Sequence, residues 1–156
     1  MKKVQKTLSV LLLAAVTLVS LNSCKKDDNV APALGSATIS GRLTANLDLN
    51  STTGPANVSG VAVLVTVLSS DQVTNTSGIT YATKVYTATS DANGLYSVNV
   101  EVGDKAVNAT VKPNDFVYNQ VQITGSTPST VRTKYSVSSQ NTVLYKGSNI
   151  VLDFAY

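Results

Sequence analysis

The chain lacks histidine and tryptophan and has a single cysteine among its 156 residues. Without histidine it has neither the usual general base at neutral pH nor the commonest zinc ligand, which excludes Ser-His-Asp triads and Cys-His pairs. The absence of tryptophan weakens the case for an aromatic platform that binds carbohydrate. We therefore expect a protein that is not an enzyme, with no catalytic residues, no cofactor and no bound metal.

The single cysteine, Cys24, follows a segment with the composition of a signal peptide. Lysines come first, and an uncharged apolar run over residues 8–21 comes next. This run is shorter than the ~20 residues of a membrane-spanning helix but has the length of a signal-peptide core. Leu21-Asn22-Ser23-Cys24 resembles the lipobox of bacterial lipoproteins. The resemblance implies that residues 1–23 are removed and that Cys24 carries the lipid that holds the protein on a membrane.

Charged residues are sparse, and their balance depends on this N-terminal segment. Lys and Arg number 12 against 9 Asp and Glu, and three of the cations, Lys2, Lys3 and Lys6, lie in the predicted signal peptide. The rest of the chain therefore has equal numbers of cations and acids. Because no basic run follows Lys25-Lys26, we expect no nucleic-acid partner.

Residues 24–35 form a polar segment that ends in proline and glycine and has no apolar periodicity, which is typical of a flexible tether. Within it, Lys26, Asp27 and Asp28 resemble the surface-export signal of Bacteroidetes lipoproteins. The resemblance implies a lipid-anchored protein on the cell-surface side of the outer membrane. The alternative is that these residues are only a solvated spacer, with the protein on the periplasmic face.

Residues 36–156 have the size of one domain. Valine, threonine, serine, asparagine and tyrosine dominate, and apolar residues alternate with polar ones rather than following a helical period. Short alternating segments separated by turn residues predict an all-β fold, an Ig-like sandwich of about seven or eight antiparallel strands. The expected strands cover residues 37–47, 61–68, 79–89, 95–102, 106–112, 116–123, 131–137 and 149–156.

The faces of several expected strands follow from the alternation. Over residues 95–102, Tyr96 and the valines that follow it at every second position share one face. The segment over residues 61–68 is apolar on both faces, which predicts a central strand covered on each side. Over residues 149–156, four apolar side chains form the expected inward set: Ile150, Leu152, Phe154 and Tyr156.

Asp91, Asn93 and Gly94 lie between two expected strands, and Asn-Gly is a strong signal for a tight hairpin turn. Asp91 and Asn93 also begin like a calcium loop, but the further acids of such a loop are missing. With its flanks, residues 87–100, the segment resembles the carboxypeptidase regulatory-like domains of Bacteroidetes surface proteins. Segments 39–43 and 58–63 resemble the opening strands of that family. The resemblance implies a transthyretin-like sandwich that serves as a non-catalytic binding, spacer or assembly module.

These observations lead to one preferred function and two alternatives. The preferred function is a membrane-anchored lipoprotein with a non-catalytic binding or structural accessory module, whose partner is a surface protein or glycan that the sequence does not identify. One alternative is a subunit of a surface assembly or nutrient-uptake complex, joined through the exposed edge of the apolar strand over residues 150–156. The other is a carboxylate-dependent hydrolase, which requires a pocket that holds at least two of Asp48, Asp71, Asp104, Asp115 and Asp153. The tyrosines Tyr81, Tyr86, Tyr118 and Tyr145 are either a stacking surface for a ligand or ordinary strand residues.

Overall fold

The computed structural model describes residues 34–72, 81–124 and 127–156, which all belong to one compact unit, Pro32–Tyr156. The predicted signal peptide, the lipidation site Cys24 and the export signal Lys26, Asp27 and Asp28 lie outside the described residues. The first strand begins at Gly35, which is the last residue of the predicted tether.

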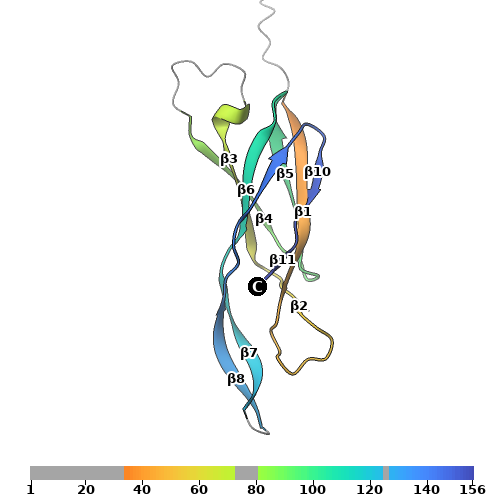
Figure 1. Cartoon of the computed structure of the whole chain (residues 1–156), viewed down its shortest axis with the longest axis vertical. Helices are drawn as coiled ribbons and strands as arrows, with labels where there is room; N and C mark the ends of the chain where they lie inside the picture. The colour runs from red at the N-terminus through yellow and green to blue at the C-terminus, as the bar shows by residue number, and fades with distance from the viewer. Residues whose placement is uncertain (1–33, 73–80, 125–126) are drawn as a thin grey trace, which may run out of the picture. The chain divides into compact units, whose positions relative to one another are not determined.

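Strand β1 (Gly35–Ala45) is the centre of a five-stranded sheet. Along one edge it pairs in parallel with β10 (Asn149–Val151) and then with β11 (Phe154–Ala155). Along the other edge it pairs antiparallel with β5 (Leu95–Val102) and β2 (Ala56–Asn57). A single long strand therefore brings together segments from both ends of the domain (Figure 1).

A second sheet has four strands in the order β4 (Thr83–Thr89), β3 (Ala62–Leu68), β6 (Val107–Pro113) and β9 (Gln140–Leu144). All three pairings in this sheet are antiparallel. A short 3-10 helix, η1 (Ser69–Gln72), follows β3. The side chain of Gln72 donates hydrogen bonds to the hydroxyl of Tyr86 on β4 and to the carbonyl oxygen of Glu101 on β5, which connects the two sheets along this side.

Between β6 and β9 the chain forms a separate antiparallel hairpin from β7 (Phe116–Thr124) and β8 (Thr127–Tyr135), which we call the arm. Figure 1 shows the arm continuing from β6 and β9 beyond the end of the sandwich opposite to the one where β1 begins. The ring of Phe116 stacks on Tyr135 at a centroid distance of 5.0 Å and meets Tyr156 edge-on at 4.9 Å, which fixes the base of the arm to the sandwich.

The core lies between the two sheets and consists mainly of valine side chains. The alternation predicted for β5 is confirmed, because Tyr96, Val98, Val100 and Val102 are buried and the residues between them are exposed. β6 shows the same pattern from Val107 to Pro113. Each buried valine stabilises the fold by roughly 1.5–3 kcal/mol relative to an exposed one, so regular alternation over several strands is enough to hold two sheets together.

The all-β sandwich is confirmed, with corrections to individual strands. β3 is central in its sheet, but its second face is not covered: Leu64 is half-buried and Leu68 is 53% exposed, because the other sheet packs against one face only. β9 was not predicted, since its segment Gln140–Leu144 opens with polar residues. The last predicted strand breaks at Leu152 and Asp153 and runs parallel to β1, not antiparallel.

Candidate functional site

An open cleft of about 610 Å³ lies on the outer face of the five-stranded sheet, over β1, β5 and the segment from β10 to β11. This volume lies within the usual range for small-ligand sites, about 300–1,000 Å³. Its lining combines one cation, two carboxylates, two serine hydroxyls and two exposed apolar side chains. The lining residues are Ser40, Gly41, Arg42, Asp91, Leu95, Tyr96, Ser97, Val151 and Asp153.

The register of the sheet explains why the cleft is hollow at its centre. Ser40 of β1 pairs with Ser97 of β5 on one side and with Val151 of β10 on the other. Side chains at directly paired positions lie on the same face of a sheet. Two small hydroxyl side chains therefore stand side by side on the outer face, and the larger Arg42 comes two residues later on the same face of β1.

The strands beneath the cleft are fixed from the core side by Gly41 and Tyr96. A Cβ atom at Gly41 would lie 1.9 Å from the carbonyl oxygen of Leu152 and 3.0 Å from a ring carbon of Tyr96. Only glycine therefore leaves room for the tyrosine ring to pass under β1, where its hydroxyl donates a 2.6 Å hydrogen bond to Leu152. Burial raises the pKa of Tyr96, and the charge of Asp153 adds to the shift, so this hydroxyl stays protonated at neutral pH.

Asp153 occupies the position where the strand pairing between β1 and the C-terminal segment is interrupted. Its Oδ1 accepts a 2.7 Å hydrogen bond from the backbone N–H of Arg42, and so replaces the carbonyl that a continuous strand would supply. Its Oδ2 has no hydrogen-bond partner among the described residues. The guanidinium of Arg42 forms no ion pair within this part of the chain, so both groups remain available to a ligand.

Asp91 reaches the cleft from the turn between β4 and β5. Its Oδ1 accepts hydrogen bonds of 2.8 Å from the backbone N–H groups of Asn93 and Leu95, while its Oδ2 has no partner in the described part of the chain. The N–H of Gly94 donates to the carbonyl of Asp91 at 3.0 Å and closes the turn. Gly94 has a φ of 71°, and no non-glycine residue in the described segments, Asn93 included, has a positive φ.

The predicted turn at Asp91, Asn93 and Gly94 is therefore present, but the predicted hairpin is wrong. β4 pairs with β3, and β5 pairs with β1, so this turn crosses from one sheet to the other. The two strands diverge because their ends bond to different neighbours: Ser90 donates to the carbonyl of Val61, and the carbonyl of Gly94 accepts from Leu43. The Oδ1 and carbonyl oxygen atoms of Asp91 accept hydrogen bonds within the turn, so they stabilise the turn itself, as expected of a turn rather than a calcium loop.

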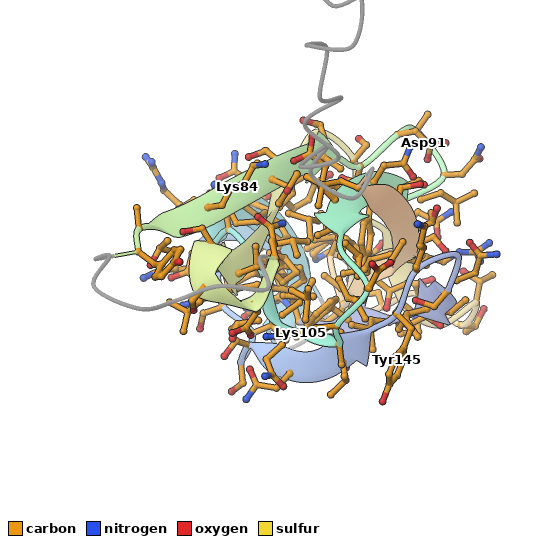
Figure 2. The ribbon with its side chains drawn as sticks, turned by 90° about the horizontal axis from the view of Figure 1, so that it is seen from above. Lys84, Asp91, Lys105 and Tyr145 are labelled. Carbon is orange, nitrogen blue, oxygen red and sulfur yellow. The ribbon has the colours of Figure 1, made fainter. Side chains whose placement is uncertain are left out.

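The five acids named for the hydrolase alternative do not meet in this cleft, and its second carboxylate, Asp91, was not among them. Of the five carboxylates considered for that function, Asp153 alone lines it. The other four have local partners: Asp48 accepts from the N–H of Asn50, Asp71 from Asn108, while Asp104 and Asp115 pair with Lys146 and Lys134. In Figure 2, Asp91 lies on the outside of the sandwich, apart from the labelled lysines Lys84 and Lys105.

The tyrosines considered as a stacking surface lie on different elements. Tyr86 is on β4, Tyr118 on the arm and Tyr145 between β9 and β10, and the last of these lies far from Asp91 in Figure 2. Tyr86 is half-buried and accepts a hydrogen bond from Gln72. These described tyrosines do not form one platform.

No motif in the sequence singles out Arg42, Ser40 or Ser97 as site residues. Their outward orientation follows from alternation in the predicted strands, but their proximity depends on which strands pair and in which register. Among the described residues, no group of three or more acidic, histidine or cysteine side chains is placed to hold a metal ion. No helix within the described ranges is long and apolar enough to cross a membrane.

The chain matches no protein-family model, no curated protein and no solved structure at a significant level. The resemblances to lipoproteins and to carboxypeptidase regulatory-like domains therefore remain predictions from the sequence.

Proposed function

We propose that this protein is a bacterial outer-membrane lipoprotein, anchored through Cys24 and exposed at the cell surface, whose β-sandwich is a non-catalytic binding module. The single observation that carries the binding role is the cleft over β1 and β5. There Arg42, Asp91 and Asp153 line the same open space, and the guanidinium and the two Oδ2 atoms of these residues have no partners among the described residues.

The chemistry of the cleft suits a polyhydroxylated ligand, such as a saccharide. A hydroxyl group both donates and accepts hydrogen bonds, so neighbouring hydroxyls satisfy a carboxylate oxygen and a guanidinium at the same time. Leu95 and Val151, which are 43% and 68% exposed, offer apolar contacts for the ring carbons of a sugar. The serine hydroxyls of Ser40 and Ser97 add further donors and acceptors.

The non-catalytic part of the proposal rests on how the carboxylates of the cleft are held. Asp91 and Asp153 each accept backbone N–H bonds through one oxygen, so both serve to shape the turn and the strand. Catalysis by a carboxylate pair requires two acids with different tasks that face the same bond. Here the two acids lie on either side of a cation and each has a structural role, which fits ligand recognition better.

The anchor is tested by feeding cells an alkyne fatty acid and comparing the wild-type chain with a Cys24→Ser variant. We expect label and membrane retention only in the wild type. A Cys24→Ser chain that stays in the membrane fraction would contradict the anchor.

The binding role is tested with the detergent-solubilised full chain on a panel of immobilised saccharides. We expect at least one saccharide to bind, and Arg42→Ala to weaken that binding by about ten-fold or more, since hydrogen bonds to charged groups contribute about 1.5–3 kcal/mol. Lys112→Ala, which removes an exposed cation from β6 in the other sheet, is the matched control and should bind normally. A panel without any Arg42-dependent saccharide would refute the cleft as a saccharide site.

A further inference from the structure

The arm exposes apolar side chains that the rest of the sandwich does not cover. Val117 and Tyr118 on β7 are 50% and 46% exposed, and Ile123 near the tip is 57% exposed; Val131 on β8 is 42% exposed. A shallow hollow of about 460 Å³ is lined by Val117, Tyr118, Asn119 and Arg132. The arm therefore exposes apolar side chains to solvent outside the core, which indicates a surface that binds a partner.

The backbone hydrogen bonds of the arm identify which edge is open. Val121 of β7 donates its N–H to the carbonyl of Leu47 at 3.0 Å and accepts from the N–H of Leu49 at 2.9 Å, so the preceding loop covers the outer edge of β7. Both backbone groups of Val121 thus point away from β8. In an antiparallel ladder such a residue belongs to a non-hydrogen-bonded pair, and these pairs alternate with hydrogen-bonded ones.

The partner of Val121 in this ladder is Thr130, so the N–H and C=O of Thr130 also point outward, on the far side of β8. By the same alternation, Arg132 opposite Asn119 and Lys134 opposite Val117 present their backbone groups along this edge. Among the described residues no strand pairs with it. Towards the tip, the next residue of β8 with outward backbone groups is Pro128, opposite Ile123. The open edge ends there, because proline has no N–H to donate.

The charge of the arm restricts what this edge can accept. The sequence over residues 116–135 contains Arg132 and Lys134 and no acidic residue. Lys134 pairs with Asp115 at 2.9 Å, whereas Arg132 forms no ion pair in the described part of the chain. Two copies of β8 aligned edge to edge would bring these cations together, which is unfavourable. An acidic segment would instead meet a cation at alternate positions.

We propose that the open edge of β8 binds an extended acidic segment of a partner protein as an added β-strand. The backbone groups of Thr130, Arg132 and Lys134 supply the main-chain hydrogen bonds, as in other cases of strand addition. Side chains of an added strand alternate between the two faces of the arm. An acidic residue beside Arg132 therefore lies on the face that carries Val117 and Asn119, while its neighbours lie on the opposite face, where Val131 is exposed. This surface is on the arm and is independent of the cleft over β1 and β5.

The test uses the full lipidated chain in detergent micelles and a fluorescent peptide in which glutamate alternates with valine. We expect anisotropy to rise on binding and to fall with added salt, and a peptide with lysine in place of glutamate not to bind. Arg132→Glu should weaken binding by about ten-fold or more. Lys105→Glu makes the same charge change at an exposed residue between β5 and β6, outside both the arm and the cleft, and should bind as the wild type does.

Thr130→Pro distinguishes strand addition from simple charge attraction. It removes one outward N–H while the ladder bonds between β7 and β8 do not use that group, and Thr130→Ala is the control for the lost side chain. We expect Thr130→Pro to weaken binding by about ten-fold and Thr130→Ala to leave it unchanged. Circular dichroism of each variant checks that the fold is retained.

Four outcomes would overturn the proposal. The first is that the peptide does not bind to the wild-type chain. The second is that Lys105→Glu weakens binding as much as Arg132→Glu, and the third is that the correctly folded Thr130→Pro variant binds normally. The fourth is a stable dimer in light scattering that Arg132→Glu abolishes, which would make a second copy the occupant of this edge. None of these results bears on Cys24 or on saccharide binding, so the two proposals fail separately.

Discussion

The phenolic hydroxyl of Tyr96 donates a 2.6 Å hydrogen bond to the backbone carbonyl oxygen of Leu152, 56 residues further along the chain. Tyr96 belongs to β5, and Leu152 lies in the break between β10 and β11, so the bond passes beneath β1 from one of its neighbours to the other. It is possible because Gly41, which pairs with Tyr96, has no side chain. The outer face above this bond carries the cleft, whose shape therefore depends on a contact in the core.

Gly41→Ala should lower the free energy of unfolding by about 2–3 kcal/mol, because the new Cβ would lie 1.9 Å from the carbonyl oxygen of Leu152. Urea denaturation measures the change. Gly54→Ala is the comparison: its Cβ meets nothing within 4 Å, so only the strain of a φ of 84° remains, about 1–2 kcal/mol. A Gly41→Ala variant no less stable than Gly54→Ala would mean that β1 and Leu152 separate easily.

Asp91→Ala should destabilise the domain by about 1–2 kcal/mol, since the backbone N–H groups of Asn93 and Leu95 both lose their acceptor. Asp91→Asn keeps an oxygen at the same place and should cost clearly less. Thermal unfolding of the three proteins checks the order. Equal losses in the two variants would indicate that the negative charge, not the acceptor, stabilises this turn.

Phe116→Ala should loosen the arm from the sandwich more than it destabilises the sandwich itself. The substitution removes the stacked contact with Tyr135 and the edge contact with Tyr156, each worth about 0.5–1.5 kcal/mol beyond the buried area. We expect hydrogen exchange to accelerate in β7 and β8 while β1 and β5 keep their protection. Uniform acceleration in all four strands would show that the arm and the sandwich unfold together.

Three buried or half-buried tyrosines should resist ionisation at alkaline pH. Burial raises the pKa of Tyr156 to about 12, with a smaller contribution from the charge of Asp115, and burial also raises the pKa of Tyr96 and Tyr135. An unfolded tyrosine has a pKa of about 10, so the folded state holds these protons more tightly. The associated stability is complete below pH ~10 and is lost as the pH rises through about 12.

Ultraviolet absorbance of phenolate, followed together with circular dichroism, measures this titration. We expect Tyr96, Tyr135 and Tyr156 to ionise only as the fold is lost. Tyr156→Phe should reduce the absorbance change that accompanies unfolding and make the free energy of unfolding less dependent on pH in this range. A single titration near the ordinary pKa, with the fold intact, would contradict the burial of these hydroxyls.

Alternation in the sequence is enough to identify β5, whose predicted residues 95–102 and predicted inward face coincide with the observed strand. This works because side-chain direction in a strand is a local property with a period of two residues. β9 has too few apolar residues for the same signal, and β8 begins earlier than predicted because its first residues, Thr127 and Pro128, lie on an exposed hairpin with no core to cover.

The site depends on information that is not local. Strand order and register decide which residues lie side by side, and both are set by contacts between residues far apart in the chain. They bring Ser40 next to Ser97 and Arg42 next to Asp153, and they leave Thr130 on an open edge. Asn-Gly at residues 93–94 predicts a tight turn correctly, yet it does not say whether the flanking strands pair with each other. Here β4 and β5 join different sheets, because the packing of the two sheets against each other stabilises that arrangement.

The amino-acid sequence by itself determined the all-β class, the orientation of most strand faces and the turn at Asp91, because each follows from backbone and side-chain preferences within a few residues. The tertiary structure alone decided that β1 pairs in parallel with the C-terminal segment, that Asp91 and Asp153 line one cleft with Arg42, and that β8 keeps an open edge. These depend on which distant segments bury apolar surface together, and burial is a property of the folded chain as a whole.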